Sequence, residues 1–312
     1  MYDTINFRLN QDEAAGIDIL SEIPNYLEHI GLHDYEGYPT VSGRLNDLKV
    51  TVNRSGVNVK DGSICKWYLG DNFQTMGRGD TKQAIEKLSD TLHLPFSKAK
   101  VTRLDIAQNF ILKNDPGIYI NHLGELKGYK RLRQPDSLYY TGTKGILCFY
   151  DKVKEQRAAG HNIPELYKGR NCLRYEQRYE HRVSQLLKTE VTGALLYDEV
   201  FYIGLLNKWK ATYKVIEKIN DAQINFMEMK TKSDLYKMGI ISLVERQGGE
   251  LKALNQIAEA RKKDELTAKQ AYDLKQAIKK ACKTQKGKSL MIENKLIREL
   301  DKKIDEAIRF YR

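Results

Sequence analysis

Residues 100–112, KVTRLDIAQNFIL, decide how the first half of this chain folds. They read as a β-strand that begins soon after Pro95 ends a preceding helix. Successive side chains of a strand point to opposite faces, so Arg103 and Asp105 share one face while Leu104 and Ile106 lie on the other. A packed sheet would normally have apolar groups on both faces. The two charges therefore indicate either an exposed surface or a polar site.

A second strand, residues 173–180 with the sequence LRYEQRYE, repeats this arrangement. The residues on one of its faces are Arg174, Glu176, Arg178 and Glu180. One interpretation is that the two strands carry surface ion pairs. The other is that Asp105 and Glu176 converge on a divalent cation, because Mg²⁺ and Mn²⁺ prefer carboxylate oxygens and leave positions open for a phosphate. The arginines would then brace the carboxylates or grip the phosphate.

A third segment, residues 137–155, contains two strands and the candidate nucleophile. On the second strand, residues 146–153, alternation places Cys148, Tyr150 and Lys152 on one face. A tyrosine phenol is a poor nucleophile near neutral pH because its pKa is about 10. A phosphate polarised by a metal ion and a nearby ammonium group would ease its attack. The chain has 19 tyrosines, so only this context singles out Tyr150.

The remaining periodicity predicts an α+β fold: a central antiparallel β-sheet with flanking helices, followed by a mostly α-helical basic C-terminal region. Further strands are expected at residues 2–9, 44–53, 57–60, 64–69 and 137–142. Helices are expected at residues 11–31, 81–93 and 115–126, and from about residue 185 onward. This gives a sheet domain at 1–185 and a basic helical region at 186–312, with breaks at Gly248-Gly249 and residues 284–289.

Charge is unevenly distributed along the chain. The net charge is +11, and residues 201–312 hold 25 Lys and Arg against 15 Asp and Glu. Such an excess attracts polyanions, of which nucleic acid is the commonest in the cytoplasm; a solvated lysine-rich helical face is the alternative. The chain has no apolar run of about 18 residues and no basic start followed by an apolar stretch, which predicts a cytoplasmic protein without a membrane partner. Its four cysteines lack zinc-site spacing.

Three motifs in order carry a resemblance to a known family. They are Arg103-Leu104-Asp105, then Leu147 to Lys152 with Glu155, then Arg174 to Glu180. Together with the opening MYDTINFRL, this order resembles the filamentous-phage gene II/X replication proteins, and it is similar to the Rep_trans plasmid initiators and related conjugative relaxases. The resemblance covers roughly residues 2–185.

The resemblance implies a rolling-circle replication initiator that nicks one DNA strand at an origin. A tyrosine is joined to the 5′ phosphate in a phosphotyrosine intermediate, and a free 3′ hydroxyl is left for a polymerase. By position, Tyr150 is the nucleophile, Lys152 assists, and Asp105 and Glu176 hold Mg²⁺ or Mn²⁺. Glu180 is the first candidate for a third ligand and Glu155 the next. The expected partners are origin DNA, single-stranded or as an extruded hairpin, a host helicase and polymerase, and a second copy of the chain in a homodimer.

Two features leave alternatives open. None of the six histidines forms the metal-binding pair of the better-known HUH initiators, which agrees with the carboxylate ligands of the gene II/X and Rep_trans groups. Tyr139 and Tyr140 remain rivals for the nucleophile, although aromatic residues in such a hairpin more often pack the sheet or stack on a base.

The helical region offers a second candidate DNA contact. Residues 231–257 are predicted to form two short helices separated by Gly239, with the spacing of a helix-turn-helix or of an ordinary helical hairpin. Lys237, Arg246 and Lys252 are available there for phosphate contacts. Two rival functions remain: a conjugative or mobilisation relaxase with the same chemistry, and a non-catalytic DNA-binding regulator in which the sheet is only a scaffold.

Overall fold

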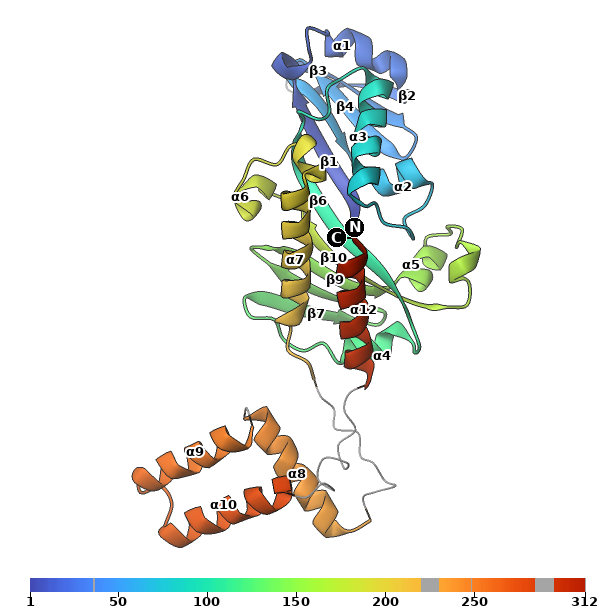
Figure 1. The fold of residues 1–312 in the computed structure, drawn as a ribbon. Coiled ribbons are helices and arrows are strands. Elements are labelled where there is room, and N and C mark those ends of the chain that lie inside the picture. The colour runs from blue at the N-terminus through green and yellow to red at the C-terminus, as the bar shows by residue number, and fades with distance from the viewer. Residues whose placement is uncertain (36, 220–229, 248, 284–294, 312) are drawn as a thin grey trace. The chain divides into compact units, whose positions relative to one another are not determined.

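A computed structural model describes residues 1–35, 37–219, 230–247, 249–283 and 295–311 (Figure 1). Its strands are β1 Tyr2–Asn10, β2 Glu28–Tyr35, β3 Tyr38–Leu45, β4 Leu48–Asn53, β5 Gly56–Lys60, β6 Lys100–Leu112, β7 Tyr129–Gln134, β8 Ser137–Gly142, β9 Gly145–Asp151 and β10 Asn171–Tyr179. Its helices are α1 Ile19–Glu22, α2 Ile64–Leu69, α3 Arg78–Leu92, α4 Pro116–Asn121, α5 Lys152–Ala158, α6 Val183–Leu187, α7 Glu199–Lys214, α8 Lys232–Arg246, α9 Glu250–Lys262, α10 Ala268–Lys283 and α12 Lys295–Tyr311.

The strands form one antiparallel sheet in the order β2-β3-β4-β5-β1-β6-β10-β9-β8-β7. The three strands that carry the charged motifs, β6, β10 and β9, are therefore neighbours near its middle. This confirms the predicted α+β class with a central antiparallel sheet, flanking helices and a helical C-terminal region.

One face of the sheet, which we call the apolar face, is covered by helices. Tyr175 of β10 lies opposite Phe149 of β9, and their rings stack at a centroid distance of 4.5 Å. Trp209 of α7 stacks on Tyr175 at 4.5 Å. Helices α7 and α12 lie side by side over this face (Figure 1), joined by an ion pair between Lys210 and Asp305. We call the other face, which carries Arg103 and Asp105, the polar face.

Three predicted elements were wrong, each for a local reason. Residues 11–31 do not form one helix, because Gly16 takes a left-handed conformation and Pro24 follows soon after; the segment ends by pairing as β2 with β3. Residues 64–69 form helix α2 rather than a strand, since the Ser63 side chain accepts the Lys66 backbone N–H. The predicted strand at 146–153 ends at Asp151, whose carboxylate caps α5.

The chain divides into two compact units, Met1–Ile219 with Glu299–Arg312, and Asn220–Arg298. The boundary predicted near residue 185 follows the last strand, but α7 and most of α12 belong with the sheet. In the second unit α10 packs against α8 and α9. Helix α8 ends at Arg246 and α9 begins at Glu250, on either side of the predicted break at Gly248-Gly249. Gly248 itself and the predicted break at 284–289 lie outside the described residues. No described helix is long and apolar enough to cross a membrane.

Candidate active site on the polar face

The register of three adjacent strands gathers the charged residues. Across β6 and β10, Asp105 lies opposite Arg178 and Asn109 opposite Arg174. Across β10 and β9, Arg174 lies opposite Tyr150. Residues opposite each other in an antiparallel pair share a face. The polar face therefore presents Tyr150 beside the Arg-Glu-Arg run of β10, which in turn lies beside the Arg-x-Asp run of β6.

Glu176 lies at the centre of this cluster and is almost fully buried. Its Oε1 accepts a hydrogen bond from Arg178 Nε at 2.9 Å, and its Oε2 accepts from Arg174 Nε at 3.4 Å. The Tyr150 hydroxyl donates to the same Oε2 at 3.2 Å. Burial acts against ionisation, but the charges of Arg174 and Arg178 outweigh it and lower the pKa of Glu176 to about 2. Glu176 is thus an anion held between two guanidinium groups.

Asp105 forms the second centre of negative charge. Arg103 donates to both of its carboxylate oxygens, at 2.7 Å for the shortest contact, and lies 3.4 Å from Glu180. Asp105 is 1% exposed. Burial raises its pKa to about 7; the Arg103 hydrogen bonds act against this rise, and the negative charge of Glu176 adds to it. Asp105 is therefore a carboxylate whose charge is incompletely compensated.

Two roles were predicted for Arg174, bracing the carboxylates or gripping a DNA phosphate, and its burial contradicts the second. The side chain is 0% exposed. Its guanidinium pairs with Asp3 of β1 at 2.7 Å and donates to the Asn72 carbonyl and the Asn109 side chain. Arg174 is therefore a positioning residue that orients Glu176. Arg103 and Arg178 are 29% and 25% exposed, so they remain able to meet a phosphate.

Asp3 is a member of the cluster that sequence reasoning missed. The register between β1 and β6 shifts between Tyr2 and Ile5, which breaks simple alternation at this position. Asp3 also accepts a hydrogen bond from the Ser63 hydroxyl at 2.7 Å. Alternation within β1 gives no signal for it, because the irregularity arises from pairing with another strand.

The three candidate tyrosines have different environments. Burial raises the pKa of the Tyr150 phenol well above its usual value, and the Glu176 charge adds to the shift. Tyr139 lies opposite Cys148, on the polar face, and is partly exposed. Tyr140 is buried on the apolar face and donates to the Gly124 carbonyl at 2.7 Å. Tyr140 thus serves the core, and Tyr150 is the one bonded to the charged cluster.

Alternation predicted that Lys152 shares a strand face with Tyr150, and this was wrong. The strand ends at Asp151, and Lys152 begins α5. Its ammonium is buried and donates to Glu155 at 2.9 Å. Burial, reinforced by the charge of Arg174, lowers the pKa of Lys152. Lys152 and Glu155 therefore approach the cluster from the end of β9.

The predicted phosphate contacts of the helical region lie in the second unit. Helix α8 continues through Gly239, so the two short helices predicted on either side of it are one. Lys237 lies 3.9 Å from Asp234, and Lys252 is exposed on α9. The side chain of Arg246 lies outside the described part of the structure.

The donor set defines which cations fit the cluster. Within the described residues, no three His, Cys, Asp or Glu side chains are grouped closely enough to hold a metal ion by themselves. Asp105 and Glu176 are buried carboxylates on the same face of adjacent strands, each with an arginine partner. Mg²⁺ is commonly bound through one or two carboxylates, water and a substrate phosphate. The residues suit such a cation in kind, but each of their four carboxylate oxygens already accepts a hydrogen bond, so a bound cation would have to displace an arginine or Tyr150.

Comparison with known families identifies the sheet domain. The model of a phage family, described as the N-terminal part of a replication-associated protein, matches residues 1–211. The chain belongs to this family. The match confirms the resemblance to the gene II/X replication proteins, and it covers every strand of the sheet and the whole charged cluster. A search of curated proteins found no significant match. Membership in this phage replication family supports a role in replication initiation and implies DNA binding.

Proposed function

We propose that this member of the phage replication family initiates rolling-circle replication by nicking one DNA strand, with Tyr150 as the nucleophile. The observation that carries the proposal is the hydrogen bond from the Tyr150 phenol to Glu176, within a run of arginines on the polar face. Phosphoryl transfer needs a nucleophile, a proton acceptor and cationic groups for the phosphate. All three occur within this cluster.

The reaction transfers a phosphoryl group from one oxygen to another. The Tyr150 oxygen attacks the phosphorus, a tyrosine–phosphate bond forms, and the bond from phosphorus to the 3′ oxygen breaks. The 5′ phosphate stays on the tyrosine, and the departing 3′ oxygen takes up a proton from solvent water to become a hydroxyl. The phenolic proton passes to Glu176, its hydrogen-bond partner at 3.2 Å. A host helicase and polymerase would then act on the opened strand.

Glu176 must become a better base during this step, because its resting pKa of about 2 makes it a weak proton acceptor. Arg178 is the partner able to change this. It is partly exposed, so an incoming phosphate can compete with Glu176 for its guanidinium. Loss of that ion pair raises the affinity of Glu176 for a proton as the phosphate arrives. Arg174 stays in place because Asp3 and the Asn72 carbonyl hold it.

Asp105 and Glu176 are the residues predicted to hold Mg²⁺ or Mn²⁺, with Glu180 or Glu155 as a further ligand. A cation on Glu176 would lower its affinity for a proton. While Glu176 accepts the phenolic proton, Asp105 would therefore hold the cation with Glu180, since Arg103 contacts both of these carboxylates. A bound cation would neutralise charge on the phosphate and lower the barrier to attack. The raised pKa of Asp105 supports the assignment, since a carboxyl group that is buried with incomplete compensation gains from an added positive charge. Lys152 remains the proposed assisting cation, held by Glu155.

The test is a search for the covalent adduct. The intact protein is incubated with Mn²⁺ and overlapping single-stranded oligonucleotides that tile both strands of the DNA carrying its gene, and mass spectrometry locates any nucleotide-linked peptide. We expect the adduct on Tyr150, and its loss in Tyr150→Phe, with Tyr139→Phe as the matched control on the same face. An adduct on Tyr139 would refute the assignment of the nucleophile. Absence of any adduct with Mg²⁺ or Mn²⁺ would refute the nicking function.

A further inference from the structure

The polar face extends well beyond the charged cluster. Residues that lie opposite each other on neighbouring strands trace this face from β6 across β1, β5 and β4 to β3. These pairs are Asn6 and Arg103, Arg8 and Asn58, Asn58 and Thr51, and Thr51 and Ser42. Each pair shares a face of the sheet, and Asn6 and Arg8 share one through alternation in β1. Ser42, Thr51 and Asn58 of the β2–β5 meander therefore lie on the same face as Tyr150.

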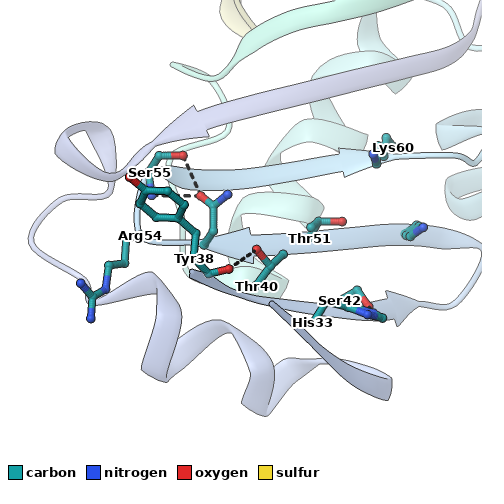
Figure 2. A pocket seen from close by; sticks show the side chains of 10 residues that line it. His33, Tyr38, Thr40, Ser42, Thr51, Arg54, Ser55 and Lys60 are labelled. Carbon is teal, nitrogen blue, oxygen red and sulfur yellow. Dashed lines mark hydrogen bonds between the residues drawn. The ribbon is translucent and has the colours of Figure 1, made fainter. Parts of the chain in front are cut away.

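A hollow of about 790 Å³ occurs on this part of the face (Figure 2). The lining residues that matter here are Tyr38, Thr40, Ser42, Lys49, Arg54 and Lys60. We call this hollow the meander groove. It is lined by hydroxyl groups and cations rather than by apolar side chains, so it suits a polar, anionic ligand.

The cations of the meander groove are available to a ligand. Arg54 and Lys60 are exposed and form no ion pair with any described residue. Lys49 has only a long contact of 4.0 Å, to Asp61. The hydroxyl oxygen of Thr51 is buried without a hydrogen-bond partner among the described residues. A buried polar atom without a partner is uncommon in native structures, and a bound polar ligand would satisfy it.

Tyr38 adds an aromatic surface beside these cations. Its side chain is 66% exposed, at the start of β3. Exposed aromatic rings interleaved with cations are typical of surfaces that bind single-stranded nucleic acid, because unpaired bases stack on the rings while the cations track the backbone. Duplex DNA keeps its bases stacked on one another, so it gains less from such a ring.

We propose that the meander groove binds the single DNA strand on one side of the cleavage site and so determines where Tyr150 cuts. This inference rests on the proposed nicking function. Four strand spacings separate β5 from β9, about 19 Å at about 4.8 Å per spacing. That span corresponds to at most about six nucleotides, since about 3.4 Å is the rise of a stacked duplex strand and an extended single strand covers more distance per nucleotide. The strand therefore contacts the groove a few nucleotides from the phosphate that is cut.

The binding test is independent of the nicking chemistry and of the origin sequence. Fluorescence anisotropy measures binding of the full chain to an oligothymidine of about 30 nucleotides and to a duplex of the same length, as a function of salt. Arg54→Gln/Lys60→Gln is compared with Lys82→Gln/Lys98→Gln, which removes the same charge from exposed sites outside the groove. Each single-strand phosphate contact contributes about 0.7 to the logarithmic salt slope, so the groove variant should lose about 1.4 and the control nothing.

Tyr38→Ala separates stacking from charge. It should weaken oligothymidine binding by at least about fivefold and leave duplex binding unchanged. Circular dichroism melts establish that each variant is folded. The proposal is overturned if the groove and control variants bind oligothymidine alike, or if the groove variant loses duplex binding only.

A cleavage assay links the meander groove to the cut. The groove variant should process an oligonucleotide that covers only the cleavage site as the wild type does. A second oligonucleotide is longer by about ten nucleotides on the side that contacts the groove. The groove variant should cut this one less efficiently than the wild type does, or at displaced positions. If the wild type forms no adduct while groove variants still lose single-strand binding, the nicking function fails and the binding site stands. Unchanged cutting of both substrates would overturn the assignment of the groove to cut-site selection.

Discussion

Glu176→Gln is the substitution that most directly tests the electrostatic account of the site. It removes the negative charge between Arg174 and Arg178 while keeping the size of the side chain and an oxygen for the Tyr150 hydrogen bond. Arg174 and Arg178 hold the pKa of Glu176 at about 2, against an ordinary value of 4.5. At about 1.4 kcal/mol per pKa unit, the ionised carboxylate contributes about 3 kcal/mol to the free energy of unfolding at neutral pH.

The stability deficit of Glu176→Gln should depend on pH, in a direction set by the lowered pKa of Glu176. A carboxylate whose pKa is lowered by folding contributes stability above its unfolded pKa, near 4.5, and loses it as pH falls toward its folded pKa, near 2. The deficit of Glu176→Gln should therefore be about 3 kcal/mol at pH 7 and about 1 kcal/mol at pH 3. The difference shrinks because the wild type loses the contribution of this group, which the variant never had.

Urea denaturation of both proteins at several pH values measures this difference. Glu190→Gln is a suitable control, because Glu190 forms an exposed ion pair with Lys100 at 3.0 Å. Exposed pairs contribute between about 0 and 1 kcal/mol, so this variant should stay close to the wild type. A deficit for Glu176→Gln that is equally small, or that does not change with pH, would refute the view that the arginines hold Glu176 ionised.

Three further predictions follow from the cluster and from the division of the chain. In urea denaturation, the free energy of unfolding of Asp105→Asn minus that of the wild type should increase by about 3 kcal/mol from pH 5 to pH 8. The pKa of Asp105 is raised to about 7 in the folded wild type, so the stability from this group is present at low pH and is lost as pH rises. A difference that stays constant with pH would contradict this. Arg174→Gln should lower the free energy of unfolding by about 3 to 5 kcal/mol, whereas Arg178→Gln should mainly weaken binding of single-stranded DNA; the reverse outcome would exchange their roles. Replacing residues 221–297 with a flexible linker should leave the first unit folded by circular dichroism and reduce the salt slope of duplex binding, and an unchanged slope would show that the basic second unit does not contact DNA.

The alternation of residues in the sequence predicted the strands at the centre of the site. In β6 and β10 the period of two placed Arg103 with Asp105, and Glu176 with Arg178, and the register confirms that each pair shares a face. Alternation failed at Lys152, since it cannot show where a strand ends and a cap begins. It also failed at residues 64–69, where an N-terminal cap outweighs the preference of the aromatic residues for strands.

Local sequence therefore determined the strand faces, the charged motifs and the family, because strand periodicity and motif order are properties of neighbouring residues. Tertiary structure alone decided which strands are adjacent, and with that the burial of Arg174, the entry of Asp3 into the cluster and the extension of the polar face to the meander groove. These depend on pairing between segments distant in the chain. The pKa values of Asp105 and Glu176 depend on it too, since burial and the distance to each arginine set the balance between desolvation and ion pairing.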